Sequence, residues 1–118
     1  RNFIGARTQE FRFARYIEDW RIKIERIGTL NYPAAAREQK IYGSLQLTVL
    51  IRPDGSVEKV DINRSSGHKV LDDAAVRIVN LAAPFAPFLS DIARDTDILG
   101  ITGTWTFSNS DKLSTDAP

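Results

Sequence analysis

The chain has 118 residues, a formal net charge of +1 and no cysteine, with 42% hydrophobic and 26% charged residues. This length suits one domain with a modest core, and the composition is that of an ordinary globular protein. The small net charge gives no long-range attraction to nucleic acid, so we expect no nucleic-acid partner. The lack of cysteine excludes disulfides, thiolate metal sites and cysteine nucleophiles.

The chain has no methionine, and its first residues, RNFIGART, lack the pattern of a signal peptide. No apolar run approaches the roughly 20 residues that a membrane-spanning helix needs. We therefore expect a fragment or a processed form of a longer protein, with any membrane anchor upstream.

Residues 6–27 are predicted to form a long amphipathic helix, which we treat as an N-terminal extension, residues 1–27. Thr8 is suited to cap its start, and Gly28 is suited to end it. Because apolar residues recur at spacings of three and four, one face of the helix is apolar. This face comprises Phe13, Ile17, Trp20, Ile24 and Ile27, and three further apolar residues lie off it, Phe11, Tyr16 and Ile22. The surplus leaves open whether the helix packs on its own domain, on a second copy or on another partner.

A short extended stretch and a short helix are predicted next. Pro33 disfavours helical geometry at the residue before it, so residues 29–32 are expected to be extended and Tyr32 exposed. Pro33 itself suits the first turn of a helix that reaches about Lys40. Gly43 then marks the change from this helix to a strand.

A β-hairpin is the clearest local signal. Between Leu45 and Ile51 apolar residues occupy every second position, as in a strand with one buried face. Pro53-Asp54-Gly55 has the chemistry of a turn, and a second strand follows through Val57, Val60 and Ile62. The change of phase between Val57 and Val60 indicates a bulge or a late strand start.

A third helix and a last strand complete the predicted domain, residues 28–108. Residues 67–82 show one narrow apolar face, and Pro84 ends the helix. After a loop, residues 98–107 alternate as a strand, and residues 109–118 are expected to be a flexible polar tail. The order predicts an α+β fold: a three-stranded antiparallel sheet with helices packed on one face, plus the N-terminal amphipathic helix.

Two clusters carry the residue types of catalytic or metal sites. Ser65, Ser66, His68 and Asp72 contain the letters of a catalytic triad, but no nucleophile elbow accompanies them. The simpler interpretation is a strand-to-helix turn in which Ser and His side chains cap the helix.

The acidic loop at Asp91, Asp95 and Asp97 does not match an EF-hand, which needs Gly at position six and Glu at position twelve. Those positions hold Thr96 and Thr102. We expect no enzyme, no catalytic residue, no metal ion and no cofactor, although a small hydrolase that uses His68 stays an open alternative.

The ordered set of motifs resembles the C-terminal domain of TonB, the energy transducer of Gram-negative bacteria. The resemblance lies in Tyr32-Pro33, the strand start at Gly43, the turn Pro53-Asp54-Gly55, SSGH followed by LDDAA, and the final TWTF. It covers residues 28–108. Many relatives have a basic and aromatic segment after the second domain helix, where this chain has NLAAPFAPF.

The resemblance implies a periplasmic domain that binds the TonB box, a short extended segment of outer-membrane transporters. The box adds as a strand to the last strand of the domain, a mode of binding that rests on main-chain hydrogen bonds. Gly100 and Gly103 in that strand are consistent with close approach of another backbone, or with relief for a bulky neighbour. The implied partner-binding residues are Thr29, Leu30, Asn31, Tyr32, Ile98, Gly100, Ile101, Thr102, Gly103, Thr104, Trp105 and Thr106.

The resemblance also implies the wider system. The full-length protein would be anchored in the inner membrane by an N-terminal helix, contact ExbB and ExbD through that part, and drive siderophore, haem or vitamin B12 uptake. A TolA-like domain of the Tol-Pal system is the nearest alternative. A homodimer, or a dimerisation module built on the first helix, stays open.

Overall fold

The computed structural model describes residues 2–4 and 11–116, with side chains described for residues 12–116. The helices are α1 (Phe11–Leu30), α2 (Ala34–Gln39), α3 (Lys69–Ala82) and α4 (Ser90–Ala93). The strands are β1 (Asn2–Ile4), β2 (Gly43–Ile51), β3 (Val57–Arg64), β4 (Leu99–Phe107) and β5 (Leu113–Asp116).

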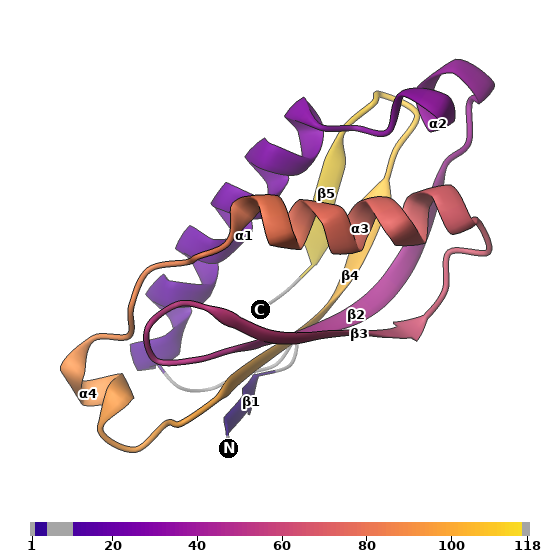
Figure 1. Ribbon diagram of the computed structural model, residues 1–118. Helices are drawn as coiled ribbons and strands as arrows, with labels where there is room; N and C mark the ends of the chain where they lie inside the picture. The colour runs from indigo at the N-terminus through magenta and orange to yellow at the C-terminus, as the bar shows by residue number, and fades with distance from the viewer. Residues whose placement is uncertain (1, 5–10, 117–118) are drawn as a thin grey trace.

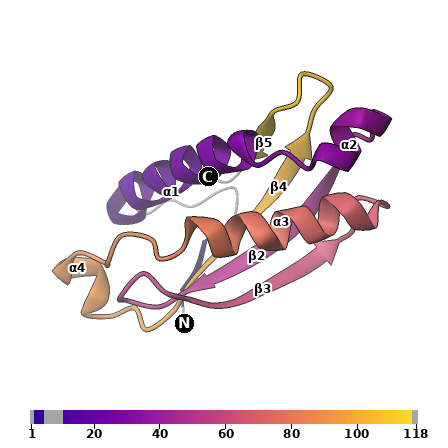
Figure 2. The ribbon, with the colours of Figure 1, turned by 45° about the horizontal axis from the view of Figure 1, so that its top comes forward.

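The strands form a single sheet in the order β1-β4-β2-β3, with β5 also paired to β4. All pairs are antiparallel except β1 with β4. Figures 1 and 2 show α1 and α3 on the same face of this sheet, with α2 beyond the end of α1. The predicted α+β class, with an antiparallel sheet and helices on one face, is confirmed.

The sheet has more strands than the predicted three, because β1 and β5 lie against the two ends of β4 (Figure 1). β5 falls in the segment predicted to be a flexible tail, and that prediction is wrong for Leu113–Asp116. Leu113 and Thr115 point inward and are only 3% and 6% exposed, whereas Ser114 and Asp116 are exposed. Burial of these two side chains secures the short strand.

The core lies between the sheet and the helices. From α1, four of the five residues of the predicted apolar face are buried, namely Phe13, Ile17, Trp20 and Ile24, and Ile27 packs against them. The ring of Trp20 lies 6.4 Å from that of Trp105 in β4 and 6.1 Å from that of Phe85. The helix therefore packs on its own domain and belongs to the same core as the sheet.

Two predictions about the ends of α1 have different outcomes. The expected cap, Thr8, lies outside the described residues. The expected stop at Gly28 is wrong, since the helix continues to Leu30 and takes Thr29 and Leu30 out of the predicted extended stretch. Gly28 has another role: a Cβ atom there would overlap the side chain of Leu113, so glycine lets β5 pack directly on the helix.

The hairpin forms as predicted. A register shift between Leu50 and Ile51, whose partners are Lys59 and Val57, confirms a bulge at the predicted change of phase. A second shift lies between Gln46 and Leu47. In the connecting turn Gly55 has φ +88°, a conformation that glycine adopts without strain. Asp54 accepts hydrogen bonds from the backbone N–H and the hydroxyl of Ser56, which fixes the turn.

The start of α3 is organised by Asp72 rather than by the predicted His cap. His68 occupies the N-cap position without a side-chain cap bond. Instead, the carboxylate of Asp72 accepts hydrogen bonds from the hydroxyls of Ser65 and Ser66 and from the Ser66 backbone N–H. Although partial burial by itself raises the pKa of Asp72, these hydrogen bonds outweigh it and lower the pKa below its usual value.

Asp72→Ala is expected to cost about 1 kcal/mol of unfolding free energy at pH 7, because the helix start loses its acceptor. A carboxylate with a lowered folded-state pKa contributes stability above its unfolded pKa of about 3.9, and this contribution is lost as pH falls through the folded pKa. Urea unfolding from pH 7 to pH 2 should therefore show the gap to wild type closing below about pH 4. Asp73→Ala, which removes an exposed pair with Lys69, is the control and should cost a few tenths of a kcal/mol. A gap that does not vary with pH would contradict this role.

Candidate partner-binding edge

β4 is the strand on which the implied binding residues centre. Its inner edge pairs with β2 along its whole length, from Leu99 to Phe107. Its outer edge pairs with β1 at Leu99–Ile101 and with β5 at Thr104–Phe107. Among the described residues no strand lies against the outer edge of Thr102 and Gly103, which separate the two short strands. The edge predicted to be open is thus largely covered by the chain's own segments.

Most of the predicted binding residues fall into two groups, on either side of Thr102 and Gly103, which pair with neither β1 nor β5. Thr104, Trp105 and Thr106 face β5, and Thr29 and Tyr32 come close to the same end of β4 through contacts with β5 and Phe107. Gly100 and Ile101 lie at the other end, opposite β1, with Ile98 directly before the strand. The residues within each group therefore lie close together, but the two groups lie at opposite ends of β4.

Tyr32 is buried rather than exposed. Its side chain is 4% exposed, its ring packs edge-on against Phe107 at 5.5 Å, and its hydroxyl donates to the carbonyl of Ser108 at 3.2 Å. In contrast, Leu30 is 77% exposed. The Asn31 side chain donates to the carbonyl of Ile27 and so completes the end of α1. Tyr32 positions the end of β4, and its ring is not available to a partner in this arrangement.

Most side chains of β4 already make contacts within the domain, so a partner would recognise mainly the backbone of this strand. Trp105 and Phe107 are fully buried under the helices. On the opposite face the hydroxyls of Thr102 and Thr106 lie 2.8 Å from Thr48 Oγ1 and 2.9 Å from Ser44 Oγ, both on β2. A strand that pairs with β4 would therefore meet main-chain groups flanked by occupied threonine side chains.

Three side chains of α1 hold β5 in place, and the sequence pointed only to Thr29, as an implied partner-binding residue, and not to the other two. Thr29 Oγ1 accepts from the backbone N–H of Leu113 at 3.2 Å, and Glu25 accepts from the backbone N–H of Thr115 at 2.7 Å. Arg21 donates to the carbonyl of Thr115 at 3.1 Å. The only sequence signal for β5 was the alternation over Leu113–Asp116, which is too short to separate a strand from a tail.

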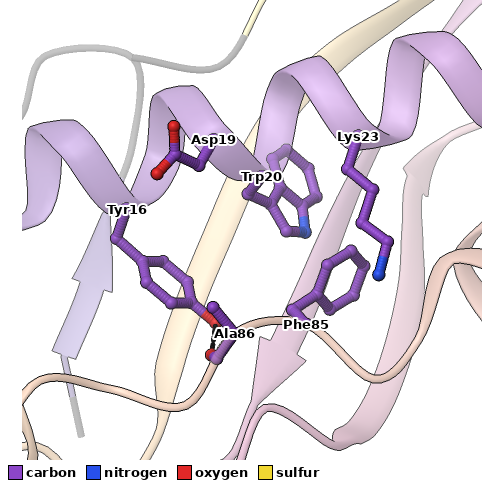
Figure 3. A pocket seen from close by; sticks show the side chains of 6 residues that line it. All are labelled: Tyr16, Asp19, Trp20, Lys23, Phe85 and Ala86. Carbon is purple, nitrogen blue, oxygen red and sulfur yellow. Dashed lines mark hydrogen bonds between the residues drawn. The ribbon is translucent and has the colours of Figure 1, made fainter.

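A hollow with a volume of about 240 Å³ lies between α1 and the segment after α3. Figure 3 shows Tyr16, Trp20 and Phe85 around it, with Lys23 at one end. The Tyr16 hydroxyl donates to the carbonyl of Ala86 at 2.7 Å, and Lys23 donates to that of Pro84 at 3.0 Å. These hydrogen bonds hold the segment after α3 against α1, so the residues around the hollow stabilise the fold.

The other clusters noted in the sequence form local contacts. Ser65, Ser66 and Asp72 come together at the start of α3, as described above, and Asp95 pairs with Arg12 at 2.8 Å. Within residues 2–4 and 11–116, no group of His, Asp or Glu side chains is arranged to hold a metal ion. No helix in the same part of the chain is long and apolar enough to cross a membrane.

The fold and this edge define a class of small α+β domain, in which helices cover one face of a short, mainly antiparallel sheet. The family model described as Gram-negative bacterial TonB protein C-terminal matches residues 29–108, more than half of the chain. The chain belongs to this family and contains a TonB-type periplasmic domain, and the family consists of transducer and interaction domains rather than enzymes. Comparison with curated proteins and with solved structures finds no significant match.

The family match leaves out the elements that cover the edge of β4. It begins in the last turn of α1 and ends directly after β4. β1, most of α1 and β5 therefore lie outside it.

Proposed function

We propose that this domain binds the TonB box of outer-membrane transporters by strand addition at β4. The observation that carries the proposal is the family match over residues 29–108, which includes the whole of β4, its partner strand β2, and β3, which pairs with β2. The geometry supports strand addition, because the described residues cover the outer edge of β4 only with strands of three and four residues. Recognition through main-chain hydrogen bonds needs little side-chain specificity, so one domain can serve several transporters.

The proposed role extends to energy transfer across the envelope. In this role a part of the protein outside this chain anchors it in the inner membrane and contacts ExbB and ExbD, which use the proton-motive force. Pulling on the bound TonB box then opens the transporter for siderophore, haem or vitamin B12. The family membership supports this role at the level of a transducer domain.

The other long edge of the sheet is a less suitable acceptor. Among the described residues no strand pairs with the outer edge of β3. β3 carries Glu58, Lys59, Asp61 and Arg64, and charges of this kind discourage pairing with another chain. Binding at β3 is therefore the alternative that a mapping experiment has to separate from binding at β4.

Isotope-labelled domain is titrated with a synthetic TonB-box peptide and followed by NMR. We expect the amide signals of β4 and of residues 29–32 to shift, while the amide signals of β3 do not change. The reason is that main-chain pairing changes the amides of the accepting strand first. A peptide with proline at a central position is the control, since proline cannot donate to the ladder. Shifts confined to Val57–Arg64, or no shifts at all, would contradict the proposal.

A further inference from the structure

A second, broader hollow lies where the outer side of α1 meets the start of β5. Its volume is about 700 Å³, and its walls include Ile22, Arg26 and Leu30 on α1, with Lys112 and Leu113 on the other side. Figures 1 and 2 show β5 beside the second half of α1. Because the three helix residues are spaced by four, they lie on one face of the helix. The hollow therefore combines a stripe of α1 with the beginning of β5.

Two apolar side chains of this stripe are left in water. Ile22 is 55% exposed, and Leu30 is the most exposed of the large apolar side chains that the structure describes. They lie about 12 Å apart along the helix axis, with Arg26 between them. Leu113 also lines the hollow and is itself buried. Contact with an apolar phase would remove this surface from water, which is favourable in proportion to the apolar area.

The hollow also carries positive charge that no described group neutralises. The side chains of Arg26 and Lys112 make no hydrogen bond or ion pair with any other residue that the structure describes. Glu25 is the one carboxylate among the described residues around the hollow, and it already accepts hydrogen bonds from the backbone N–H and the hydroxyl of Thr115. Two cations without partners, beside exposed apolar side chains, favour an anionic and amphipathic partner.

The residue types favour a lipid surface over a protein partner. The cores of protein interfaces are enriched in aromatic residues and depleted in lysine, and a few aromatic or arginine anchors carry most of the binding energy. Among the described residues, no aromatic side chain lines this hollow. Aliphatic side chains on one helix face, with basic residues beside them, are typical of elements that lie in the interface of an anionic bilayer.

We propose that this hollow docks the domain on the surface of a bilayer that contains anionic phospholipids. Ile22 and Leu30 enter the boundary between head groups and acyl chains, while Arg26 and Lys112 bind lipid phosphates. Helix α1 then lies parallel to the membrane plane. This contact goes beyond the proposed function, because it involves neither a transporter nor the edge of β4. Ile22, Arg26 and Lys112 also lie outside the family match over residues 29–108.

Co-sedimentation of the whole chain with lipid vesicles tests the docking. The chain is mixed at low salt with vesicles of phosphatidylglycerol and phosphatidylcholine in equal parts, or of phosphatidylcholine alone. Binding to the anionic vesicles is expected to be at least about tenfold tighter, since two cations act near the surface. Binding should weaken as salt is raised, because screening shortens the reach of these charges.

Two outcomes of this experiment would overturn the proposal. If the chain stays in solution with the anionic vesicles, the membrane is not its partner, and the hollow is left to a protein. If the chain sediments to the same extent without vesicles, it associates with further copies of itself instead.

Matched variants on two helices separate this site from a general effect of charge. Arg26→Glu should weaken binding to the anionic vesicles by about fivefold or more. Arg77→Glu on α3 changes the net charge equally, but it should change binding by less than about twofold, because its charge lies away from the docked surface. In the same way Leu30→Ser should weaken binding, whereas Leu81→Ser, at a leucine of α3 that is 52% exposed, should not.

All four substituted side chains are exposed, so the variants are expected to fold, and circular dichroism checks this. Equal effects at Arg26 and Arg77, or at Leu30 and Leu81, would contradict docking through this hollow.

Discussion

Trp20→Ala is expected to lower the unfolding free energy of the whole domain by about 3–5 kcal/mol, the usual cost of removing a buried tryptophan. Trp20 is 3% exposed and lies against Trp105 and Phe85, so it joins α1 to the sheet and to the segment after α3. Urea unfolding followed by circular dichroism should show one cooperative transition at a lower midpoint. Loss of α1 alone should not be seen as a separate step, since the helix shares the core.

Two control variants define what Trp20 contributes. Ile22→Ala changes the same helix at a side chain that is 55% exposed, and its effect should stay within about 0.5 kcal/mol. The buried indole N–H of Trp20 has no hydrogen-bond acceptor among the described residues. Trp20→Phe should therefore cost clearly less than Trp20→Ala, because it removes volume but no satisfied hydrogen bond. If Trp20→Ala and Ile22→Ala had equal effects, α1 would be a detachable extension after all.

Gly55→Ala is expected to cost about 2–4 kcal/mol, from the strain of a positive φ together with overpacking. Gly55 has φ +88°, and an added Cβ atom would overlap the backbone carbonyl of Phe85, which cannot move as a flexible side chain could. The carbonyl of Gly55 also accepts from the Phe85 N–H at 2.8 Å. The substitution therefore disturbs both the hairpin turn and its contact with the segment after α3.

Gly67→Ala separates the two causes. Gly67 has φ +85°, but a Cβ atom there would meet nothing within 4 Å. It should show only the conformational cost of about 1–2 kcal/mol. The loss of unfolding free energy is measured for both variants by thermal or urea unfolding. The loss in Gly55→Ala minus the loss in Gly67→Ala is the cost of the overlap with Phe85. Equal effects at the two glycines would mean that the contact with Phe85 adjusts freely.

The elements with long periodic patterns were predictable from sequence. The buried face of α1, the hairpin and the face of α3 each repeat over enough residues for helix or strand spacing to be recognised. The motif order then indicated the family, and the family match confirms it. Pro33 is predicted in the first turn of a short helix and occupies the N-cap directly before α2, and the bulge in the hairpin follows from a change of phase.

The edge of β4 was less predictable because its neighbours are short. β5 has four residues, and its stability comes from α1, which lies far away in sequence. Glycine at position 28 predicts the end of a helix from the local sequence. In the structure it lies inside α1, where it makes room for Leu113 of β5. The family resemblance implies that Tyr32 binds the partner, whereas the burial of its ring depends on Phe107. Each of these facts depends on long-range packing that no local pattern contains.

The central claim is that the TonB box pairs with β4. The most direct measurement is an NMR search for contacts between the backbone protons of a bound TonB-box peptide and those of the domain. Strand addition at β4 predicts contacts to backbone protons within Leu99–Phe107. Peptide contacts to Val57–Arg64, or no contacts to β4, would contradict it.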